Sequence, residues 1–343
     1  MGRKNTRNLN MPPHMHPRIQ RSGKVYYYMY TGDKPRKEIA LGSDFILALR
    51  KYADLNVFDV PKVGARFSDV ITKYQVEAVP KLAPNTIKMY RSDIKHLSAF
   101  FAKAQLSQIR PMHIKQFLED HSDKPTTANR CKRLFSTMWN HARGWGYTDL
   151  PNPCEGIKGY SLAKRTVYIT DEIFATVYAH ASAPLQDAMD LAYLTGQRPA
   201  DALRMTSHDV IDGHLIITQE KTKQPLRIVI RGELAELLAR IDKRKQAHSI
   251  VTSALLTNTH GKRLTAAVLR NHFDNAREKA AEAMPKLAEA IRSFWFYDLR
   301  AKAADDTSDE RGDQAASDLL GHDSVKTTQR HYLRRGKVVQ PTK

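Results

Sequence analysis

Two short segments of linker composition limit what this chain can fold into. Residues 61–67 contain a proline and a glycine, and residues 150–164 contain two of each. Proline and glycine interrupt helices and strands, so both segments are predicted to join separate folded units. A chain of 343 residues is also too long for one typical hydrophobic core. The sequence therefore predicts three successive domains, which cover 1–62, 66–158 and 165–343.

The first domain is predicted to be a small sheet with one helix. Residues 1–20 are polar and basic, and we expect them to be flexible. The aromatic run 25–30 and the run 37–42 flank a turn that contains glycine and proline, which is typical of a hairpin. Residues 44–56 have a helical pattern. We therefore expect a three-stranded-sheet module that carries a helix.

The second domain is predicted to be helical. In residues 83–104, and again in residues 126–143, apolar side chains recur at spacings of three and four, which gives each helix one apolar face. Gly144 suits the position just after the second helix. The other faces are basic, and we predict that they contact DNA phosphates, with ordinary solvated helix faces as the alternative. These basic residues are Lys88, Arg91, Lys95, Arg130, Lys132 and Arg133.

The net charge of +19 extends along the whole chain. Residues 1–64 carry 12 Lys and Arg against 5 Asp and Glu (+7), residues 65–160 carry 15 against 8 (+7), and residues 161–343 carry 28 against 23 (+5). A nucleic-acid-binding surface that runs over several domains would have this distribution. A basic protein with solvated faces would have it too, so the motifs of the third domain must decide.

Membrane, secreted and metal-dependent classes receive no support. The chain has no run of about 18 uncharged apolar residues, and its N-terminus lacks the apolar segment of a secretory signal. Its two cysteines, Cys131 and Cys154, provide neither a disulfide framework nor zinc-ligand spacing, and Cys131 falls on an apolar helix face. We therefore expect a protein of the reducing cytoplasm with no metal, no other cofactor and no membrane partner.

The third domain combines helices with a hairpin. Two β-prone runs, 214–218 and 226–230, flank a polar turn. The predicted fold class is therefore multidomain and mainly α with small β elements, and the third domain is α+β. Helices are expected near residues 171–181, 185–195, 199–206, 233–246, 265–283 and 314–320.

Two arginines of this domain lie in sequence contexts that are typical of phosphate-binding positions. Arg198 follows a glycine turn and precedes a proline, so it lies at the start of a helix, where its guanidinium and the helix dipole both favour an anion. Asp201 lies one turn further on and is placed to orient it. Arg300 follows an aromatic run, and a charge in apolar surroundings needs a partner, which is Asp298, another buried acid or a phosphate.

Three further residues extend this set. Lys221 lies at the hairpin tip, and His322 follows Gly321, which is expected to end a helix. Tyr332 lies in a basic run ten residues after His322. Taken alone, each of these residues is ordinary in a basic protein. Together, two arginines, a histidine and a tyrosine suggest that the tyrosine attacks a phosphodiester while the arginines hold its charge.

The order of these motifs resembles that of the tyrosine recombinases, and most closely that of phage-type (lambda-like) integrases. The matching elements are TGQRPADALRM at 195–205, a hairpin lysine, YDLR at 297–300, LLGH at 319–322 and a tyrosine about ten residues later. The resemblance covers essentially the whole chain. It implies an arm-site-binding module, a helical core-site-binding domain and a catalytic domain, in that order.

The resemblance also implies a role for each residue. Arg198 and Arg300 would clamp the scissile phosphate and stabilise the transition state. Lys221 would protonate the leaving 5′-oxygen, His322 would hydrogen-bond the phosphate and assist proton transfer, and Tyr332 would form a 3′-phosphotyrosyl bond. Rejoining would need neither ATP nor a metal, because the covalent link retains the energy of the broken bond.

The chain departs from the family pattern at two positions. Tyr297 stands where the family usually has a histidine; its hydroxyl can donate to a phosphate but carries no positive charge, so we expect retuned or reduced catalysis. The family nucleophile commonly lies nine residues after the LLGH histidine, where this chain has His331. One extra residue turns a helical side chain by about 100°, so the local path must differ. Tyr332 remains the predicted nucleophile, with His331 as a neighbour that accepts a proton or contacts DNA.

We expect a site-specific DNA recombinase that integrates and excises mobile DNA in the cytoplasm of a bacterial host. Its predicted partners are double-stranded DNA with core and arm sites and further copies of the chain in a homotetramer. The resemblance alone suggests an excisionase and a host DNA-bending protein. Two alternatives stay open: a type IB topoisomerase-like strand transferase, and an architectural DNA-binding protein with weakened catalysis.

Overall fold

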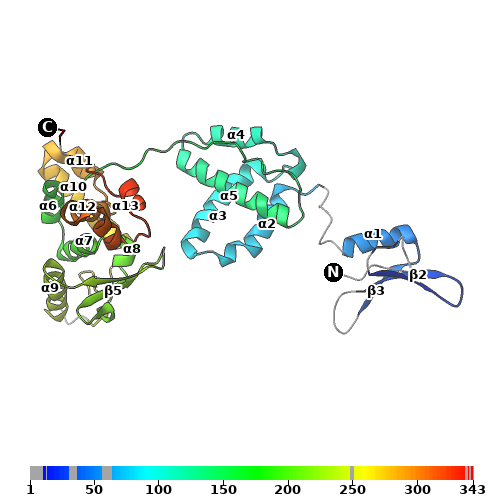
Figure 1. Cartoon of the computed structure of the whole chain (residues 1–343), viewed down its shortest axis with the longest axis horizontal. Helices are drawn as coiled ribbons and strands as arrows, with labels where there is room; N and C mark the ends of the chain where they lie inside the picture. Colours follow the sequence, from blue (N-terminus) through cyan, green and yellow to red (C-terminus); the bar gives the residue numbers. More distant parts are fainter. Residues whose placement is uncertain are drawn as a thin grey trace. The chain divides into compact units, whose positions relative to one another are not determined.

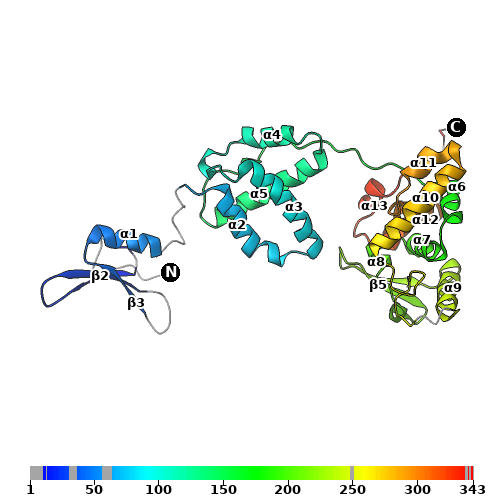
Figure 2. The same ribbon diagram turned by 180° about the vertical axis from the view of Figure 1, so that it is seen from behind.

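The computed structural model divides the chain into two compact units, Met1–Ala163 and Lys164–Lys343 (Figures 1 and 2). It describes residues 11–12, 14–30, 37–55, 64–247, 251–336, 339 and 341–342, without the side chains of 53–55. Among the described residues, helices dominate both units and each unit has one three-stranded sheet. The predicted fold class, mainly α with small β elements, is confirmed. The boundary between the two units in the sequence falls at the end of the segment 150–164, which was expected to be a linker.

The N-terminal part of the first unit is a small antiparallel sheet with a helix. Its strands are β1 (Met15–Ile19), β2 (Val25–Tyr30) and β3 (Glu38–Gly42) in the order β1-β2-β3, and α1 (Phe45–Leu55) packs against them. The expectation that residues 1–20 are flexible is wrong for 15–19. Those residues form β1 because Met15 pairs with Met29 on the neighbouring strand and is buried there. Residues 1–10 lie outside the described part.

The rest of the first unit is a helical domain around an aromatic core. Its α-helices are α2 (Phe67–Glu77), α3 (Pro84–Phe101), α4 (Pro111–Asp120) and α5 (Pro125–Gly144), with 3-10 turns η1 (Val79–Lys81) and η2 (Leu106–Gln108). The predicted apolar faces of α3 and α5 meet in this core. Gly144 is the last helical residue, not the one after it, and Gly146 takes the left-handed conformation (φ 71°) that ends the helix.

The second unit packs eight α-helices, among its described residues, with a small sheet. The sheet is β4 (Val210–Ile211), β5 (His214–Thr218) and β6 (Pro225–Val229), all antiparallel. The helices are α6 (Asp171–Ala179), α7 (Ala183–Thr195), α8 (Pro199–Ala202), α9 (Glu233–Ala247), α10 (Ala266–Ala283), α11 (Ala288–Ser293), α12 (Asp298–Leu320) and α13 (Val325–His331), with 3-10 turns η3 (Ser207–Asp209) and η4 (Pro285–Leu287).

The long helix α12 differs from the prediction of a short helix near 314–320. It begins at Asp298, and Gly312 interrupts its helical geometry (φ 86°) before it continues to Leu320. Its first half buries small residues such as Ala301 and Ala304. Alanine adds little to an apolar periodicity, so the pattern of large hydrophobic residues did not reveal this half.

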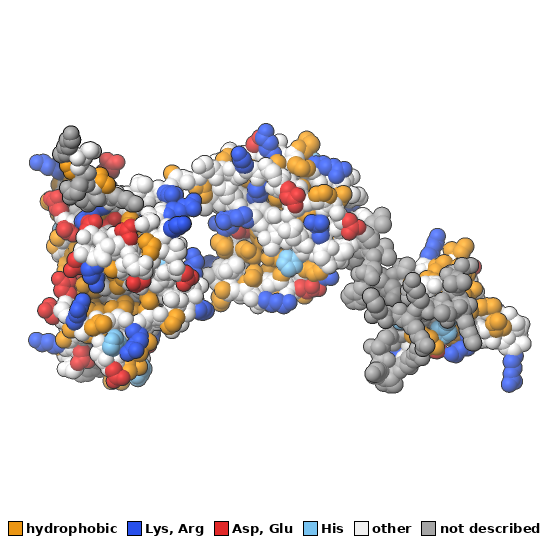
Figure 3. Space-filling model, viewed as in Figure 1, with side chains coloured by type: hydrophobic (Ala, Val, Ile, Leu, Met, Phe, Trp, Pro, Cys, Tyr) orange, Lys and Arg blue, Asp and Glu red, His pale blue; other side chains and the backbone are white. Residues whose placement is uncertain are grey.

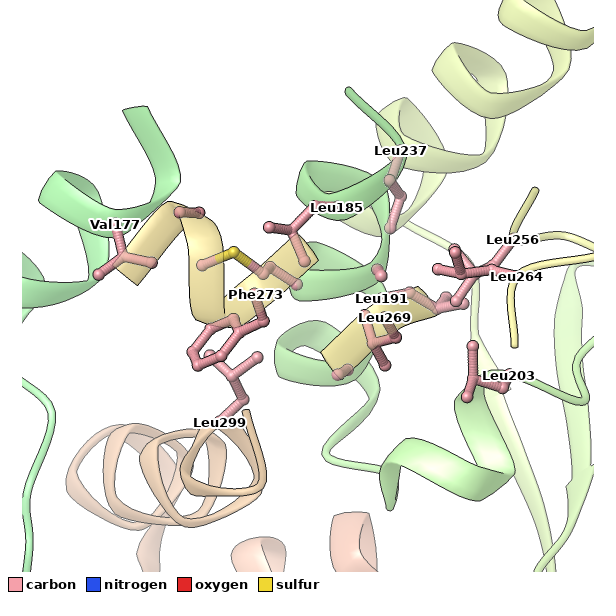
Figure 4. Packing of buried hydrophobic residues seen from close by; sticks show 14 of the residues in the cluster. Val177, Leu185, Leu191, Leu203, Leu237, Leu256, Leu264, Leu269, Phe273 and Leu299 are labelled. Atoms are coloured by element: carbon pink, nitrogen blue, oxygen red, sulfur yellow. The ribbon is translucent and has the colours of Figure 1, made fainter. Parts of the chain in front are cut away.

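The core of the second unit lies between α7, α10 and the start of α12. Leu191, Leu269, Phe273 and Leu299 meet there, as Figure 4 shows. This packing fixes the helix ends that carry the candidate catalytic residues. None of the described helices is long and apolar enough to cross a membrane.

Candidate active site

Arg198 is held at the junction of two helices. The glycine that follows α7, Gly196, is left-handed (φ 63°), and a Cβ there would lie 3.0 Å from a methyl of Leu320. Only glycine therefore allows this turn to approach the end of α12 without strain. Arg198 follows as the N-cap of α8, as the sequence predicts, and its Nη1 donates to Gln219 Oε1 at 2.8 Å.

Asp201 connects this arginine to the hairpin. Its carboxylate is buried and lies 3.8 Å from the Arg198 guanidinium. It also accepts hydrogen bonds from Arg204 (2.9 Å) and from the backbone N–H of Glu220 (2.8 Å). The predicted orienting role of Asp201 is compatible with these contacts, which also fix the start of the β5–β6 turn.

Arg300 is fully buried in α12 with no carboxylate partner among the described residues. Its guanidinium donates to the carbonyls of Gly196 (2.7 Å) and Leu320 (2.8 Å), while its Nε has no hydrogen-bond partner. Burial lowers the pKa of this guanidinium from its usual value. Asp298 is not the partner of Arg300, because Asp298 pairs with Arg165 and with Arg334 (2.6 Å). Neither Asp298 nor another described acid pairs with Arg300, and its binding of a phosphate stays a prediction.

Two buried glutamines, Gln197 and Gln219, join the arginines and were missed in the sequence. Gln219 Nε2 donates to Gln197 Oε1 (2.7 Å) and to the Leu320 carbonyl (2.8 Å). Its Oε1 is the acceptor of Arg198. The end of β5 is thereby tied to the end of α12. Gln197 stands beside Arg198 in the motif and could have been selected, whereas no local pattern marks Gln219.

His322 lies just after Gly321, which ends α12 in the left-handed conformation as expected. Its Nε2 is 3.1 Å from Arg300 Nη2, and its Nδ1 is 2.8 Å from Thr328 Oγ1. A guanidinium can only donate, so Nε2 accepts and Nδ1 carries the proton. Burial, with the charges of Arg300 and Arg198, lowers the pKa of His322 to about 4. The imidazole is therefore neutral at pH 7.

Tyr332 follows α13 and is only 8% exposed. Its hydroxyl lies 2.9 Å from that of Tyr297, and its ring centroid is 4.9 Å from that of His322 and 5.2 Å from Arg300 Cζ. Burial raises the pKa of Tyr332, but the hydrogen bond with Tyr297 and the charges of Arg300 and Arg198 outweigh it, so the pKa is lowered overall. These surroundings favour the ionised form of the Tyr332 hydroxyl.

The extra residue before Tyr332 is accommodated at the end of α13. The carbonyl of Thr328 accepts from the backbone N–H groups of both Tyr332 (2.8 Å) and Leu333 (3.2 Å). The second of these bonds spans five residues and marks a turn wider than α-helical. As a result Tyr332 is buried in the cluster, while His331, at the usual position of the nucleophile, is exposed.

Lys221 lies at the exposed tip of the β5–β6 hairpin and lines the same cavity as the other residues. The cavity has a volume of about 570 Å³ and is strongly basic. Its walls include Lys164, Arg165, Arg198, Lys221, Tyr297, His322, Arg330, His331, Tyr332 and Arg334. Every catalytic residue predicted from the sequence lines this cavity except Arg300, which is buried and contacts His322 and Tyr332.

The basic residues predicted to bind DNA differ in their surroundings. Lys88, Arg91, Lys95 and Arg133 are exposed and Lys132 is half-buried, and Figure 3 shows Lys and Arg side chains on the surface of both units. Arg130 instead donates to Asp93 with Nε (2.7 Å) and Nη2 (2.6 Å). This pairing gives Arg130 a structural role, and its contact with DNA stays a prediction.

The described residues include no group of three or more His, Cys, Asp or Glu side chains that could hold a metal ion. Cys131 and Cys154 are buried, and burial raises the pKa of each thiol to about 12. Such thiols are core residues with little thiolate character.

Comparisons with known proteins agree with this arrangement. Residues 169–337 match the model of the phage integrase family, and residues 66–121 match that of the phage integrase N-terminal SAM-like domain. The chain is 25% identical to the integrase of Escherichia phage HK022 and 24% identical to that of Escherichia phage lambda, over 98% of each chain in both cases. Its fold is similar to that of a lambda integrase tetramer bound to a Holliday junction (TM-score 0.69, 21% identity, 97% of this chain and 99% of the other). The chain belongs to the phage integrase family, the tyrosine-type site-specific recombinases.

Proposed function

We propose that this recombinase cleaves DNA with the hydroxyl of Tyr332 and holds the scissile phosphate with Arg198 and Arg300. The observation that carries the proposal is the position of Tyr332, whose hydroxyl is buried beside Arg300 and His322 in a basic cavity. A phosphodiester is an anion, and the cavity offers it fixed cations. Such preorganised charge is usually the largest part of catalysis in phosphoryl transfer.

The two arginines bind the phosphate in different ways. The Arg300 guanidinium is buried from solvent and has no carboxylate partner among the described residues. In this proposal a bound phosphate supplies the counter-charge. Arg198 is half-buried beside Gln219 and Asp201 and faces the cavity. Both charges then lie where the negative charge grows in the pentacoordinate transition state.

Lys221 and His322 move the protons. Tyr332 Oη forms a bond to phosphorus while the bond from phosphorus to the 5′-oxygen breaks, and the leaving oxygen takes a proton from the Lys221 ammonium. The neutral His322 would take the Tyr332 proton on Nε2, its one unprotonated nitrogen, once Arg300 Nη2 turns from Nε2 to the bound phosphate. A bound phosphate offsets the Arg300 and Arg198 charges that contribute to the low pKa of His322, so proton acceptance becomes easier in the complex.

Rejoining reverses these steps on a new strand. The phosphotyrosyl bond is a phosphodiester like the one it replaces, so a free 5′-hydroxyl can attack it without ATP or a metal. We propose that the chain integrates and excises mobile DNA in the cytoplasm of a bacterial host by this route. Asp201 would orient Arg198, and His331 would contact DNA at the cavity rim.

The first unit supplies two DNA-binding parts in this proposal. The helical domain would bind the core site, and the exposed residues Lys88, Arg91, Lys95 and Arg133 give it a basic surface. The sheet module would bind arm sites. Four copies would act together, as the lambda integrase tetramer on a Holliday junction suggests by analogy. An excisionase and a host DNA-bending protein are further partners that family likeness suggests.

A suicide DNA substrate tests the proposed nucleophile. It carries a nick beside the cleavage site, so the leaving strand diffuses away and the covalent adduct accumulates. The unaltered protein should form the adduct and Tyr332→Phe should not. Tyr178→Phe is the matched control, since its hydroxyl bonds Asp190 away from the cavity and its loss should leave cleavage intact.

The chemical nature of the adduct separates Tyr332 from His331. A phosphotyrosyl bond survives acid and a phosphohistidyl bond does not, and fragmentation of the modified peptide locates the nucleotide. A covalent DNA adduct formed by Tyr332→Phe would contradict the proposal. No adduct with the unaltered protein would favour an architectural role. Relaxation of supercoils without exchange between two duplexes would favour the topoisomerase-like alternative.

A further inference from the structure

Two tyrosine hydroxyls face each other at the candidate active site. Oη of Tyr297 and Oη of Tyr332 are 2.9 Å apart, although the residues are separated by 35 positions in the chain. Tyr297 precedes α12 and is 41% exposed, whereas Tyr332 follows α13 and is 8% exposed. Two phenols at this distance share one hydrogen bond, so one of them donates and the other accepts.

We infer that Tyr297 is a positioning residue for the nucleophile: its hydroxyl donates to the Tyr332 oxygen, holds that oxygen at the arginine cluster and stabilises the phenolate that attacks. This inference rests on the proposed role of Tyr332. It assigns Tyr297 a partner that its family position does not suggest, because the contact is with the nucleophile itself. A hydrogen bond from a neutral donor to an oxyanion is stronger than one to a neutral phenol.

The charges around the pair favour this direction of donation. Arg300 Cζ lies 5.2 Å from the centre of the Tyr332 ring and favours negative charge there. Burial raises the pKa of Tyr297 to about 12, with a further rise from its hydrogen bond and charge interaction with Tyr332. The pKa of Tyr332 is lowered overall, because the hydrogen bond from Tyr297 and the cations outweigh burial. The shared proton therefore stays on Tyr297, and Tyr332 ionises first.

Other charged groups also face this pair, so the hydrogen bond must be isolated experimentally. The charged and titratable groups that line the cavity beside Tyr297 and Tyr332 are Lys164, Arg165, Arg198, Lys221, His322, Asp323, Arg330, His331 and Arg334. Replacing Tyr297 with phenylalanine leaves all of these groups in place. Its ring also remains, so the packing around Tyr332 is preserved and only the donor is removed.

This role of Tyr297 leaves the proton transfers of the proposed reaction unchanged. The Tyr332 oxygen bonds to phosphorus, its proton passes to His322, and the 5′-oxygen takes the electron pair of the broken bond and a proton from Lys221. Tyr297 keeps its own proton throughout. Its hydrogen bond strengthens as charge develops on the Tyr332 oxygen, so it lowers the barrier without taking part in proton transfer.

The direct test is a titration of Tyr332 in the DNA-free protein. Tyrosine labelled with carbon-13 at Cζ is followed by NMR from pH 7 to 12, and Tyr332→Phe assigns the signal. We expect Tyr332 to titrate below the ordinary value of about 10. In Tyr297→Phe its acid dissociation constant should fall roughly ten- to a hundredfold, the range expected for a hydrogen bond to a charged group.

Cleavage of the suicide substrate supplies the second readout. The single-turnover rate at pH 7 should fall by about the same factor in Tyr297→Phe, and Tyr297→His, which restores a donor, should recover part of it. Tyr178→Phe is the control for loss of a hydroxyl elsewhere in the unit. Thermal unfolding of each variant shows that the fold is retained.

Each result bears on the inference. An unchanged titration of Tyr332 in Tyr297→Phe would overturn it, even if cleavage slows, because Tyr297 would then act on the phosphate or on packing alone. A raised pKa with a slower rate supports it. Failure of the nucleophile assignment is a separate outcome, since an adduct in Tyr332→Phe appears in the suicide assay and leaves the titration of the pair unaffected.

Discussion

Arg130 in the helical domain and Arg300 in the catalytic unit are both arginines held against a packed helix, but their partners differ. Arg130 binds Asp93 through two nitrogens, and Asp93 is itself fully buried. Arg300 is fully buried too, yet its partners are two backbone carbonyls and a neutral histidine. The nearest acid in sequence, Asp298, pairs with two other arginines.

This difference suggests that the charge of Arg130 has a structural role, whereas the charge of Arg300 is available to a ligand. Burial of a charge costs free energy unless a counter-charge and hydrogen bonds compensate it. At Arg130 the chain provides the counter-charge, so the pair is complete. At Arg300 the chain provides acceptors but no negative charge among the described residues, which agrees with the proposal that a bound phosphate completes the site. The following predictions test this contrast.

The largest expected effect is on cleavage in Arg300→Lys. Lysine keeps the positive charge but loses the planar fork that reaches both the helix-end carbonyls and the phosphate. Single-turnover cleavage of the suicide substrate should fall roughly a thousandfold, the loss expected when a preorganised donor to the transition state is removed. DNA affinity, measured separately at fixed salt, should change far less.

The control for this variant is Arg292→Lys. Arg292 lies in the same unit and is half exposed, and it pairs with Glu278 away from the cavity. Its replacement should leave the cleavage rate within a few-fold. Equal losses in both variants would mean that the buried position of Arg300 carries no catalytic significance, and the contrast with Arg130 would fail.

The next effect is on stability, in Arg130→Met. Removal of this guanidinium leaves the Asp93 carboxylate buried without a counter-charge, which should cost about 3–5 kcal/mol of the free energy of unfolding of the helical domain. Urea unfolding monitored in that domain measures it. The double variant Asp93→Asn with Arg130→Met should lose less than Arg130→Met alone, because no charge is then left unpaired. Equal losses would contradict the idea of a self-contained pair.

His322 gives a smaller, pH-dependent effect. Its folded pKa of about 4 lies below the usual 6.5, so between these values the unfolded chain binds more protons than the folded one. Stability is therefore complete above pH 6.5 and is lost as pH falls toward 4. At pH 5 the loss should be at most about 2 kcal/mol. His322→Gln should remove this component, and an identical fall from pH 7.5 to 5 in both proteins would refute it.

The sequence predicted the members of the candidate site better than their contacts. Arg198, Lys221, His322 and Tyr332 could be selected because turn and helix-end signals are local, and their order resembles a family pattern. Arg300 was found as a charge that needs a partner, but Asp298 was one of the partners considered and is wrong. Which acid reaches which arginine depends on contacts across more than 100 residues, such as Arg165 with Asp298.

The fold shows the same limit. Helices with large apolar faces, such as α3 and α5, were predicted from periodicity. The first half of α12, which buries alanines, was missed, and so was β1, which forms only because β2 lies beside it. The sequence could predict only that the backbone before Tyr332 departs from the family pattern. The turn that buries Tyr332 in place of His331 depends on a second hydrogen bond to the Thr328 carbonyl, which no local sequence pattern reveals.

The smallest expected effect distinguishes free cations from paired ones on the helical domain. Lys88 is exposed on α3, whereas Lys115 on α4 lies 3.7 Å from Glu119. A lysine that contacts a phosphate displaces a counterion, so Lys88→Gln should reduce the slope of log affinity against log salt by about 0.9. Lys115→Gln should change it less, since Glu119 already offsets that charge. By the same reasoning Arg130, which Asp93 neutralises, should add little to the slope. Equal reductions for Lys88 and Lys115 would show that any basic residue of this domain contributes, and that pairing within the chain does not decide which charges meet DNA.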